Sequence, residues 1–397
     1  MRIKILTLST VYPNPAEPAM GVFVRSRLQH MAALADVMVL VPESIASYRR
    51  RLVNWKRRAP ARSCDEGLEI LRPRWFYPPG AGPWNAWFLF LQLIWPVLRL
   101  RREFPFQIID AHFGHPEGVA AALLSWLFRR PFTVTLRGSE QLHQKYRLRR
   151  LCMGWSLRRA SRVIAVSEKL RSLAIGLGVV PSNAVTIPNG VDTELFHPRE
   201  RTASREAYGV AAGVGLIVSV GHLIELKGHH RIIRAVRTLV DGGVNVRLLV
   251  AGGRGRADDY EPALRRQIAA LGLNGRVDLL GHLERTQLPG LLSAADVFCL
   301  ASSREGWPNV VHEALACGTP VVATNAGAVP EMIPSEKYGV VVPLDDEDGL
   351  AAALRHALFY QWDRAAIAVW GQSRSWQHVA QEVLREIESV CKQIPGG

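Results

Sequence analysis

The chain has 397 residues, of which 48% are hydrophobic and 21% are charged. This balance excludes a disordered chain, a collagen-like repeat and a disulfide-dense miniprotein, and the length suggests two or three domains. The formal net charge of +14 is uneven, because residues 1–195 carry 28 Lys and Arg against 13 Asp and Glu, and residues 196–397 carry 21 against 22. The basic half suits an anionic membrane, a nucleic acid or an acidic substrate, with arginine-rich codon composition as the simpler explanation.

Two features of the sequence favour a cytoplasmic protein. The five cysteines are scattered and form no Cys-x-x-Cys pair, so neither a zinc knuckle nor a disulfide framework is indicated. The N-terminal residues run directly into an apolar strand without the h-region of a signal peptide, so this segment does not predict export.

Short runs rich in Val, Ile and Leu alternate with helical stretches along the chain, which is typical of parallel sheets covered on both faces. The predicted strands of the first half are 2–8, 36–41, 107–111, 132–136, 162–166 and 184–187. After the turn signal at Pro188–Gly190 the pattern restarts, with predicted strands at 215–220, 245–250, 276–280, 297–301, 320–323 and 339–342. The sequence therefore predicts two doubly wound α/β domains, followed by an amphipathic helix over 375–392.

Two stretches of the basic half suggest a surface function. Arg49–Arg51 and Lys56–Arg58 flank Trp55 and would suit an anionic membrane interface, where each basic residue contributes about 1 kcal/mol. Residues 84–100 are apolar nearly all round but are too short for a spanning helix and contain Pro96. They predict either an interfacial helix or an ordinary buried helix with a solvated charge run after it.

Ligands of open parallel sheets bind at the carboxyl ends of the strands, so the loops there are the candidate site. A proline-rich loop after the first strand ends at Gly21, where backbone N–H groups could approach an anion. His112 and Arg137 each follow a predicted strand. The ordinary alternatives are that Gly21 only forms a turn and that His112 is a structural histidine.

The segment Val220–Gly228 also joins a predicted strand to a helix. It fits neither a Gly-x-Gly-x-x-Gly nor a Walker pattern. It nevertheless places Lys227, and with it Gly221 and His222, beside backbone amides where a diphosphate could lie. The alternative is a solvated lysine on an ordinary turn.

The segment Ser302–Ala314 carries two carboxylates, Glu305 and Glu313, on either side of a strand-to-helix turn. A helix that begins near Asn309 would leave the N–H groups of Val310 and Val311 free for phosphate oxygens. Carboxylates at that place can accept hydrogen bonds from sugar hydroxyls.

This segment, continued by Cys317–Thr324 and Gly327–Glu331, closely resembles the Glu-x7-Glu region of the family 4 retaining glycosyltransferases. Tyr12–Arg27 resembles the donor loop of that family, in the branch that contains teichuronic acid and exopolysaccharide transferases. Further blocks that resemble the family are Val163–Leu170, Ile187–Phe196 and Ala294–Val297, while residues 42–105 match poorly.

The resemblance implies a GT-B fold, in which two Rossmann-like domains face each other across a cleft and the last helix crosses back to the first domain. It predicts an acceptor-side domain over 1–195, completed by 372–397, and a donor-binding domain over 196–371.

The resemblance also implies roles for site residues: Glu313 binds the ribose, Glu305 and the backbone after it hold the sugar, and Lys227 neutralises the diphosphate. His112 should lie by the transferred sugar. The predicted catalytic residues are His112, Lys227 and Glu305, and the predicted substrate-binding residues are Gly21, Arg137, Asn189, Gly221, His222, Gly306, Trp307, Pro308, Asn309, Val310, Val311 and Glu313.

Two departures from the family pattern concern charge. His222 stands where many members have Arg, and Arg137 and Glu140 replace the common His and Asp of the His-Gly-Ser-Asp block. The first changes the charge offered to a phosphate, and the second changes the acceptor side.

The function implied is transfer of a hexosyl group, with retention, from a nucleoside-diphosphate sugar to a lipid-linked or polysaccharide acceptor in cell-surface polysaccharide synthesis. The mechanism that the resemblance implies requires no metal ion, and no cofactor is expected; the sequence agrees, since it has no tight His and Cys ligand cluster. The expected place is the inner face of the cytoplasmic membrane, in peripheral contact through the basic half. The alternatives are a nucleotide-sugar epimerase or hydrolase of similar fold, and a non-catalytic binder of anionic surfaces; nucleic acid is not expected, because RNP, KH and helix-turn-helix patterns are absent.

Overall fold

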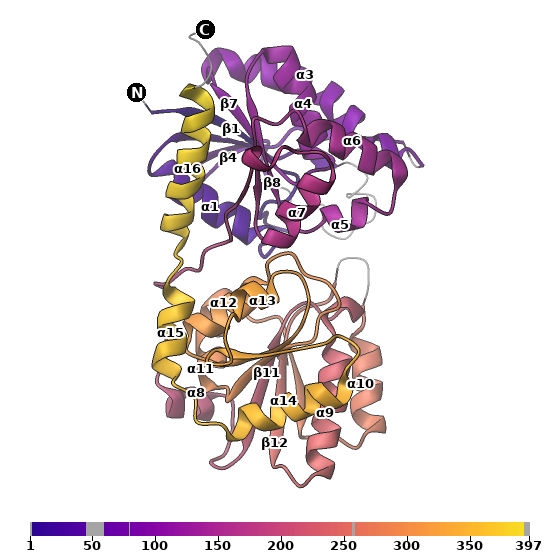
Figure 1. Ribbon diagram of the computed structural model, residues 1–397, viewed down its shortest axis with the longest axis vertical. Helices are drawn as coiled ribbons and strands as arrows, with labels where there is room; N and C mark the ends of the chain where they lie inside the picture. The colour runs from indigo at the N-terminus through magenta and orange to yellow at the C-terminus, as the bar shows by residue number, and fades with distance from the viewer. Residues whose placement is uncertain (1, 45–58, 79, 256–258, 393–397) are drawn as a thin grey trace. The chain divides into compact units, whose positions relative to one another are not determined.

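The computed structural model describes residues 2–44, 59–78, 80–255 and 259–392, which form two compact units (Figure 1). Unit 1 comprises Met1–Gly190 and Trp376–Gly397, and unit 2 comprises Val191–Ser375. The chain passes from one unit to the other after Gly190 and again after Ser375. The predicted domain boundaries, after residues 195 and 371, lie close to these two points. The acceptor and donor roles of the two domains stay predictions.

Unit 1 is built on an eight-stranded sheet in the order β10-β9-β8-β7-β1-β2-β5-β4, parallel except for β4. Its strands are β1 (Lys4–Leu8), β2 (Asp36–Leu40), β4 (Arg62–Asp65), β5 (Leu68–Leu71), β7 (Ile108–His112), β8 (Phe132–Leu136), β9 (Arg162–Ala165) and β10 (Ala184–Thr186). The short strands β3 (Glu43–Ser44) and β6 (Arg74–Trp75) pair separately, in parallel.

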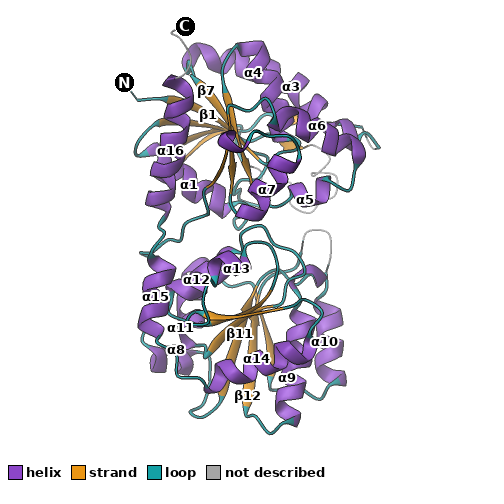
Figure 2. Cartoon of the chain, viewed as in Figure 1, coloured by secondary structure: helices purple, strands orange, loops and turns teal. Residues whose placement is uncertain are grey.

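Helices cover both faces of this sheet (Figure 2), so the central strands β7 and β8 are buried at every residue. Burial on both faces explains their continuous apolar runs. The helices of unit 1 are α1 (Val22–Ala32), α3 (Asn85–Glu103), α4 (Glu117–Phe128), α5 (Glu140–His143), α6 (Arg147–Leu157), α7 (Glu168–Gly176) and α16 (Trp376–Lys392), with short 3-10 turns η2 (Gly82–Trp84) and η3 (Pro181–Asn183).

The last helix, α16, belongs to the core of unit 1 although it is far away in sequence. Its apolar residues recur at helical spacing, and all except the partly buried Cys391 lie buried with residues of α1 and of the sheet. An ion pair of 2.8 Å between Arg162 Nε and Glu386 Oε2 ties α16 to β9. The predicted return of the final helix to the first domain is confirmed.

Unit 2 contains a six-stranded parallel sheet in the order β13-β12-β11-β14-β15-β16. The strands are β11 (Gly215–Val220), β12 (Val246–Ala251), β13 (Val277–Gly281), β14 (Val297–Leu300), β15 (Val321–Thr324) and β16 (Gly339–Val342). The helices are α8 (Arg201–Ala207), α9 (His229–Asp241), α10 (Glu261–Ala270), α11 (Leu288–Ala294), α12 (Asn309–Ala316), α13 (Val329–Met332), α14 (Glu347–Phe359) and α15 (Arg364–Gln372), with 3-10 turns η4 (Glu225–Lys227) and η5 (Arg285–Gln287). Two apolar cores, one on each face, hold the sheet between the helices.

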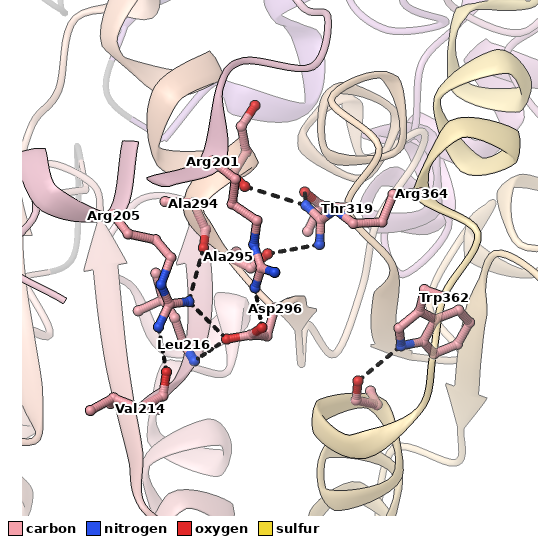
Figure 3. Close-up of polar contacts among 12 residues, drawn as sticks. Arg201, Arg205, Val214, Leu216, Ala294, Ala295, Asp296, Thr319, Trp362 and Arg364 are labelled. Atoms are coloured by element: carbon pink, nitrogen blue, oxygen red, sulfur yellow. Dashed lines mark hydrogen bonds and ion pairs between the residues drawn. The ribbon is translucent and has the colours of Figure 1, made fainter. Parts of the chain in front are cut away.

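Asp296 fastens the start of the unit 2 sheet to α8 (Figure 3). Its carboxylate accepts the Leu216 N–H at 2.7 Å and an Arg205 guanidinium N–H at 3.0 Å, and it also pairs with Arg201. Nearby, Arg364 donates to the carbonyl of Ala295 at 3.0 Å. The role of Asp296 in this structure is therefore to hold elements together at the amino ends of the strands.

The predicted strands of both parallel sheets are confirmed, but β3, β4, β5 and β6 were not predicted. They are two to four residues long, and β4 carries the polar sequence Arg-Ser-Cys-Asp, which lacks an apolar run. The basic clusters at 49–51 and 56–58, with Trp55, lie outside the described residues.

Residues 84–100 fall mainly in α3, which buries one face and exposes another. Buried packing is therefore confirmed for one face only. Among the described residues, no helix combines the length and the hydropathy needed to cross a membrane.

The packing of α16 generates a stability prediction. Ile387 is fully buried in the unit 1 core, so Ile387→Ala should lower the free energy of unfolding by about 2 to 5 kcal/mol. Calorimetry of the unfolding of the whole chain measures this, with Glu388→Ala, on the exposed side of the same helix, as the matched control. Equal unfolding temperatures for the two variants would contradict the assigned packing.

Candidate functional site

The loops at the carboxyl ends of the unit 2 strands bring together two of the predicted catalytic residues. Lys227 lies in η4 after β11, and Glu305 lies between β14 and α12. The Lys227 Nζ is 2.7 Å from the Glu305 Oε1, and both side chains are largely buried. A cation and a carboxylate that are 78 residues apart in sequence thus form one polar centre.

Close backbone contacts hold these two loops in place. Gly228 has a φ of 72°, and a Cβ there would stand 1.8 Å from the Ala301 carbonyl oxygen. The Ser303 N–H donates to the Leu226 carbonyl at 3.0 Å, which joins the loop of Lys227 to the loop of Glu305. At Gly327, similarly, a Cβ would stand only 2.3 Å from the Glu305 carbonyl oxygen. Only glycine fits such approaches.

His229, which sequence reasoning missed, supports Gly221. Its Nε2 lies 3.3 Å from the Gly221 carbonyl and its Nδ1 lies 3.2 Å from the Ser219 hydroxyl. Because a carbonyl can only accept, Nε2 carries the proton. Burial lowers the pKa of His229 to about 4, so the ring is neutral near pH 7. One feature of the sequence could have pointed to His229, namely its position directly after Gly228, at the start of α9. The predicted binding residue His222, in contrast, is exposed.

The predicted helix start is confirmed, since α12 begins at Asn309 after Pro308. The Val311 N–H is not free as predicted, because it donates to the Pro308 carbonyl at 3.0 Å in a tight first turn. The carbonyl of Gly306 accepts the Ala328 N–H at 3.1 Å. The indole N–H of Trp307 is buried and has no hydrogen-bond partner among the described residues.

Glu313 lies on α12, one turn beyond its start, with its side chain partly exposed. Burial raises the pKa of its carboxyl to about 7, against the lowering effect of Arg285, while Asp192 adds to the rise. Arg285 is itself engaged by Asp192 at 3.0 Å. The Glu313 carboxyl therefore changes its charge near neutral pH.

In unit 1, the predicted residue His112 ends β7 and is fully buried. Its Nε2 lies 3.2 Å from Asp110 Oδ2, and its Nδ1 lies 3.1 Å from a terminal nitrogen of Arg137. An arginine can only donate, so Nδ1 is the acceptor and the Nε2 proton points to Asp110. Burial, reinforced by the charge of Arg137, lowers the pKa of His112 to about 3, so the ring is neutral.

The same network continues to the other predicted residues of unit 1. Arg137 donates to Asn189 Oδ1 at 2.9 Å, so these two and His112 lie together. Glu140 accepts the backbone N–H groups of Gly114, Arg137 and Gly138 at 2.7 to 3.2 Å, and thereby holds the loop after β8. Gly21 begins α1 with a φ of 70°, and a Cβ there would stand 2.7 Å from the Val11 carbonyl oxygen.

Glu117, at the start of α4, is a buried carboxyl that sequence reasoning missed. Its Oε1 accepts the Thr10 N–H at 3.1 Å and the Thr10 hydroxyl, whereas its Oε2 has no partner among the described residues. Burial raises the pKa of Glu117 to about 7, although the Thr10 hydrogen bonds lower it. Glutamate is common at the start of helices, so the sequence alone could not mark Glu117 as a candidate site residue.

Within the described residues, no group of three or more His, Cys, Asp or Glu side chains is arranged to hold a metal ion. In the acidic run Asp345–Asp348, two side chains are engaged around α14: Asp346 accepts the Gly349 N–H at 2.8 Å, and Glu347 pairs with Arg234. A hollow of about 630 Å³ in unit 2 borders the start of β11 and lies among Arg201, Arg205 and Arg355. It is at the amino ends of the strands, so the candidate site is elsewhere.

Two families match the chain in succession. Residues 20–195 match Glycosyltransferase Family 4, and residues 200–368 match Glycosyl transferases group 1. TuaC of Bacillus subtilis, whose name assigns it to teichuronic acid biosynthesis as a glycosyltransferase, is 28% identical over 351 residues, which are 86% of each chain. The D-inositol 3-phosphate glycosyltransferase of Saccharomonospora viridis is 33% identical over 213 residues, covering 51% of this chain and 49% of that protein. The chain thus spans most of TuaC but about half of the inositol phosphate enzyme.

Solved structures show the same fold. Sucrose-phosphate synthase from Thermosynechococcus elongatus has a TM-score of 0.79 at 20% identity, covering 99% of this chain and all of that one. Anabaena Alr3699/HepE, solved in complex with UDP-glucose, has a TM-score of 0.75 at 22% identity, covering 98% of this chain and all of that one. At these identities the likeness concerns the fold alone.

The buried Glu117 generates a pH prediction. Its native pKa of about 7 exceeds the usual value of 4.5, so the folded state binds more protons between these pH values and stability falls as pH rises through them. Glu117→Gln keeps the acceptor for Thr10 and should reduce this fall by on the order of 3 kcal/mol. Urea unfolding at pH 5 and pH 8 measures it, with the exposed Glu336→Gln as control. An unchanged pH dependence in Glu117→Gln would contradict the raised pKa.

Proposed function

This chain belongs to family 4 of the glycosyltransferases, and from that premise we propose that it transfers a hexosyl group, with retention of configuration, from a nucleoside-diphosphate sugar to an acceptor hydroxyl. The acceptor we propose is lipid-linked or a growing polysaccharide, in the synthesis of a capsule, exopolysaccharide or lipopolysaccharide. The observation that carries the proposal is the pair of Lys227 and Glu305, 2.7 Å apart at the carboxyl edge of a parallel sheet.

The pair suits a donor that is both anionic and rich in hydroxyl groups. The Lys227 ammonium is neutralised by one carboxylate, and a bound diphosphate would offer it more negative charge. Glu305 would then be free to accept hydrogen bonds from the sugar hydroxyls. The Trp307 N–H, which has no hydrogen-bond partner among the described residues, is a proposed further donor, and Glu313 is the proposed acceptor for the ribose hydroxyls.

The proposed reaction is a displacement on one face of the sugar. The bond from the anomeric carbon to the diphosphate oxygen breaks, the acceptor oxygen bonds on the same face, and its proton passes to the leaving diphosphate. Lys227 and the backbone amides after Glu305 would stabilise the charge that develops on the leaving group. Because Lys227 supplies the counter-charge, the proposal requires no metal ion.

Unit 1 is the proposed acceptor side, with Arg137, Asn189 and the α1 start at Gly21 as polar contacts. Both ring nitrogens of His112 are engaged, so His112 would reach the transferred sugar only after Arg137 releases its Nδ1. In the arrangement seen, the contribution of His112 is to position Arg137. We keep its contact with the sugar as a prediction.

Two comparisons support the donor and the product class. HepE has been solved with UDP-glucose, and the name of TuaC refers to the biosynthesis of teichuronic acid. We propose that this chain acts at the cytoplasmic face of the membrane, where an aqueous donor and a lipid-linked acceptor can meet.

Substitution at the pair tests the proposed donor site. Lys227→Ala and Glu305→Gln should each lower kcat by about 10² to 10³, because each removes a group that acts on the developing charge or the sugar. Transfer of labelled sugar to a membrane fraction measures this, with Lys337→Ala at an exposed position as control. Full activity in both site variants, with unchanged unfolding temperatures, would overturn the assignment.

Ligand-induced stabilisation identifies the donor. UDP, GDP, ADP and their sugars are added one at a time, with and without EDTA. At a ligand concentration of about 100 times Kd, binding stabilises the folded state by about 2.7 kcal/mol. We expect one base to raise the unfolding temperature and EDTA to leave the shift unchanged. A shift abolished by EDTA would overturn metal independence, and no shift with any nucleotide would overturn the donor site. Donor turnover without any acceptor would favour the hydrolase or epimerase alternative.

A further inference from the structure

Helix α3 carries two separate apolar stripes. One stripe is buried against the rest of unit 1 and consists of Ala86, Leu89, Phe90, Leu93, Val97 and Leu100. The other, here called the outer stripe, consists of Trp84 at the end of η2 and of Trp87, Leu91, Trp95 and Leu98 in α3. These residues are between 41% and 65% exposed. The spacings of three and four residues place the outer stripe along one side of the helix, over about 21 Å.

Polar groups of α3 are turned away from the outer stripe or gathered at one end. Gln92 donates to the Phe76 carbonyl at 2.7 Å and accepts the Phe76 N–H at 2.9 Å, so its amide is used by the backbone of the neighbouring segment. Residues 84–102 contain no Asp or Glu, and Arg99, Arg101 and Arg102 stand at the end of the stripe. Glu103, the last residue of α3, is paired with Arg62 at 2.9 Å. The stripe is therefore apolar along its length and basic at its end.

Helix α4 packs beside α3 (Figure 1) and also carries exposed apolar side chains. Arg101 donates to the Phe128 carbonyl at 3.3 Å, and this places the ends of the two helices together. At that end of α4, Trp126 and Leu127 are also exposed. Exposed large apolar side chains that gather on neighbouring helices point to a site of interaction.

We propose that the outer stripe of α3 docks onto an anionic lipid surface, lying in the plane of the interface with its tryptophans among the headgroups. This rests on the proposed function, for which it names the element that meets the membrane. Tryptophan favours the water–lipid boundary, because its ring is apolar and its N–H is polar. Arg99, which lies 5.8 Å from the Trp95 ring centroid, and Arg102 would pair with lipid phosphates.

Charge argues for lipid over a second copy of the chain. The stripe brings no acid that could pair with the arginines of another copy, whereas an anionic bilayer supplies both an apolar layer and phosphate groups. The first 195 residues, which include α3, also carry an excess of 15 positive charges, 28 against 13. Long-range attraction to an anionic surface follows from such an excess.

The test uses the full chain and needs neither donor nor acceptor. Co-sedimentation is measured with vesicles of phosphatidylcholine alone and with vesicles that contain phosphatidylglycerol. We expect binding to the anionic vesicles, weakened by salt. The triple variant Trp87→Ser, Leu91→Ser, Trp95→Ser should bind them at least tenfold more weakly. The control Phe359→Ser, Tyr360→Ser, which removes exposed aromatic surface from unit 2, should bind like the wild type.

A second variant separates charge from insertion. Arg99→Gln with Arg102→Gln should weaken binding to the anionic vesicles by on the order of tenfold, with no change on neutral vesicles. Circular dichroism melting and the nucleotide-induced shift should be unchanged in every variant, so a failed donor site and a failed membrane surface give different results. Wild-type binding by the triple variant would overturn the proposal. So would a wild-type dimer, seen by analytical ultracentrifugation, that does not bind vesicles and becomes monomeric in the triple variant.

Discussion

The buried ion pair between Arg27 and Asp110 is the constraint on which the polar interior of unit 1 depends. The two side chains are 2% and 0% exposed and lie 3.1 Å apart. Removing two charges from water costs several kcal/mol for each, so such a pair persists only where hydrogen bonds complete it. Thr135 accepts from Arg27 at 2.7 Å and Thr133 donates to Asp110 at 2.7 Å.

The pair also fixes the charge of Asp110. Burial alone would raise the pKa of Asp110, but Arg27 and His112 outweigh it and lower the pKa to about 2. The permanent charge of Asp110 then sets the tautomer of His112, and His112 in turn positions Arg137.

The second ion pair, Lys227 with Glu305, is of a different kind. It lies between two loops, and its side chains are 20% and 10% exposed, so a ligand can replace its partners at lower cost than in the fully buried pair. The two loops that carry the pair are held by their backbones, through the close approaches at Gly228 and Gly327. The Arg27–Asp110 pair thus fixes the charges inside unit 1. The Lys227–Glu305 pair holds two opposite charges where a ligand could bind them.

The sequence predicted the parallel sheets well, because strands covered on both faces need uninterrupted apolar runs. The β4 and β5 hairpin escaped prediction, since its strands are short and half polar. Lys227 and Glu305 could each be placed in a loop, but their contact joins residues 78 positions apart and depends on which strands are neighbours. The engagement of both His112 nitrogens could not be predicted either, since it depends on the direction of the Arg137 side chain. For α3, composition showed an apolar helix, and only the fold could separate its buried stripe from its exposed one.

The place of α16 in unit 1 has a consequence for how the chain is made. Residues Val191–Ser375, the whole of unit 2, are synthesised between the sheet of unit 1 and the helix that completes it. At ribosomal rates of 5 to 20 residues per second, this interval lasts about ten to forty seconds. During that time the side of the sheet that later receives Val383, Leu384 and Ile387 has no helix to bury it. The apolar residues of α1 and of the sheet that pack against α16 therefore stay exposed in the nascent N-terminal half until α16 has been synthesised.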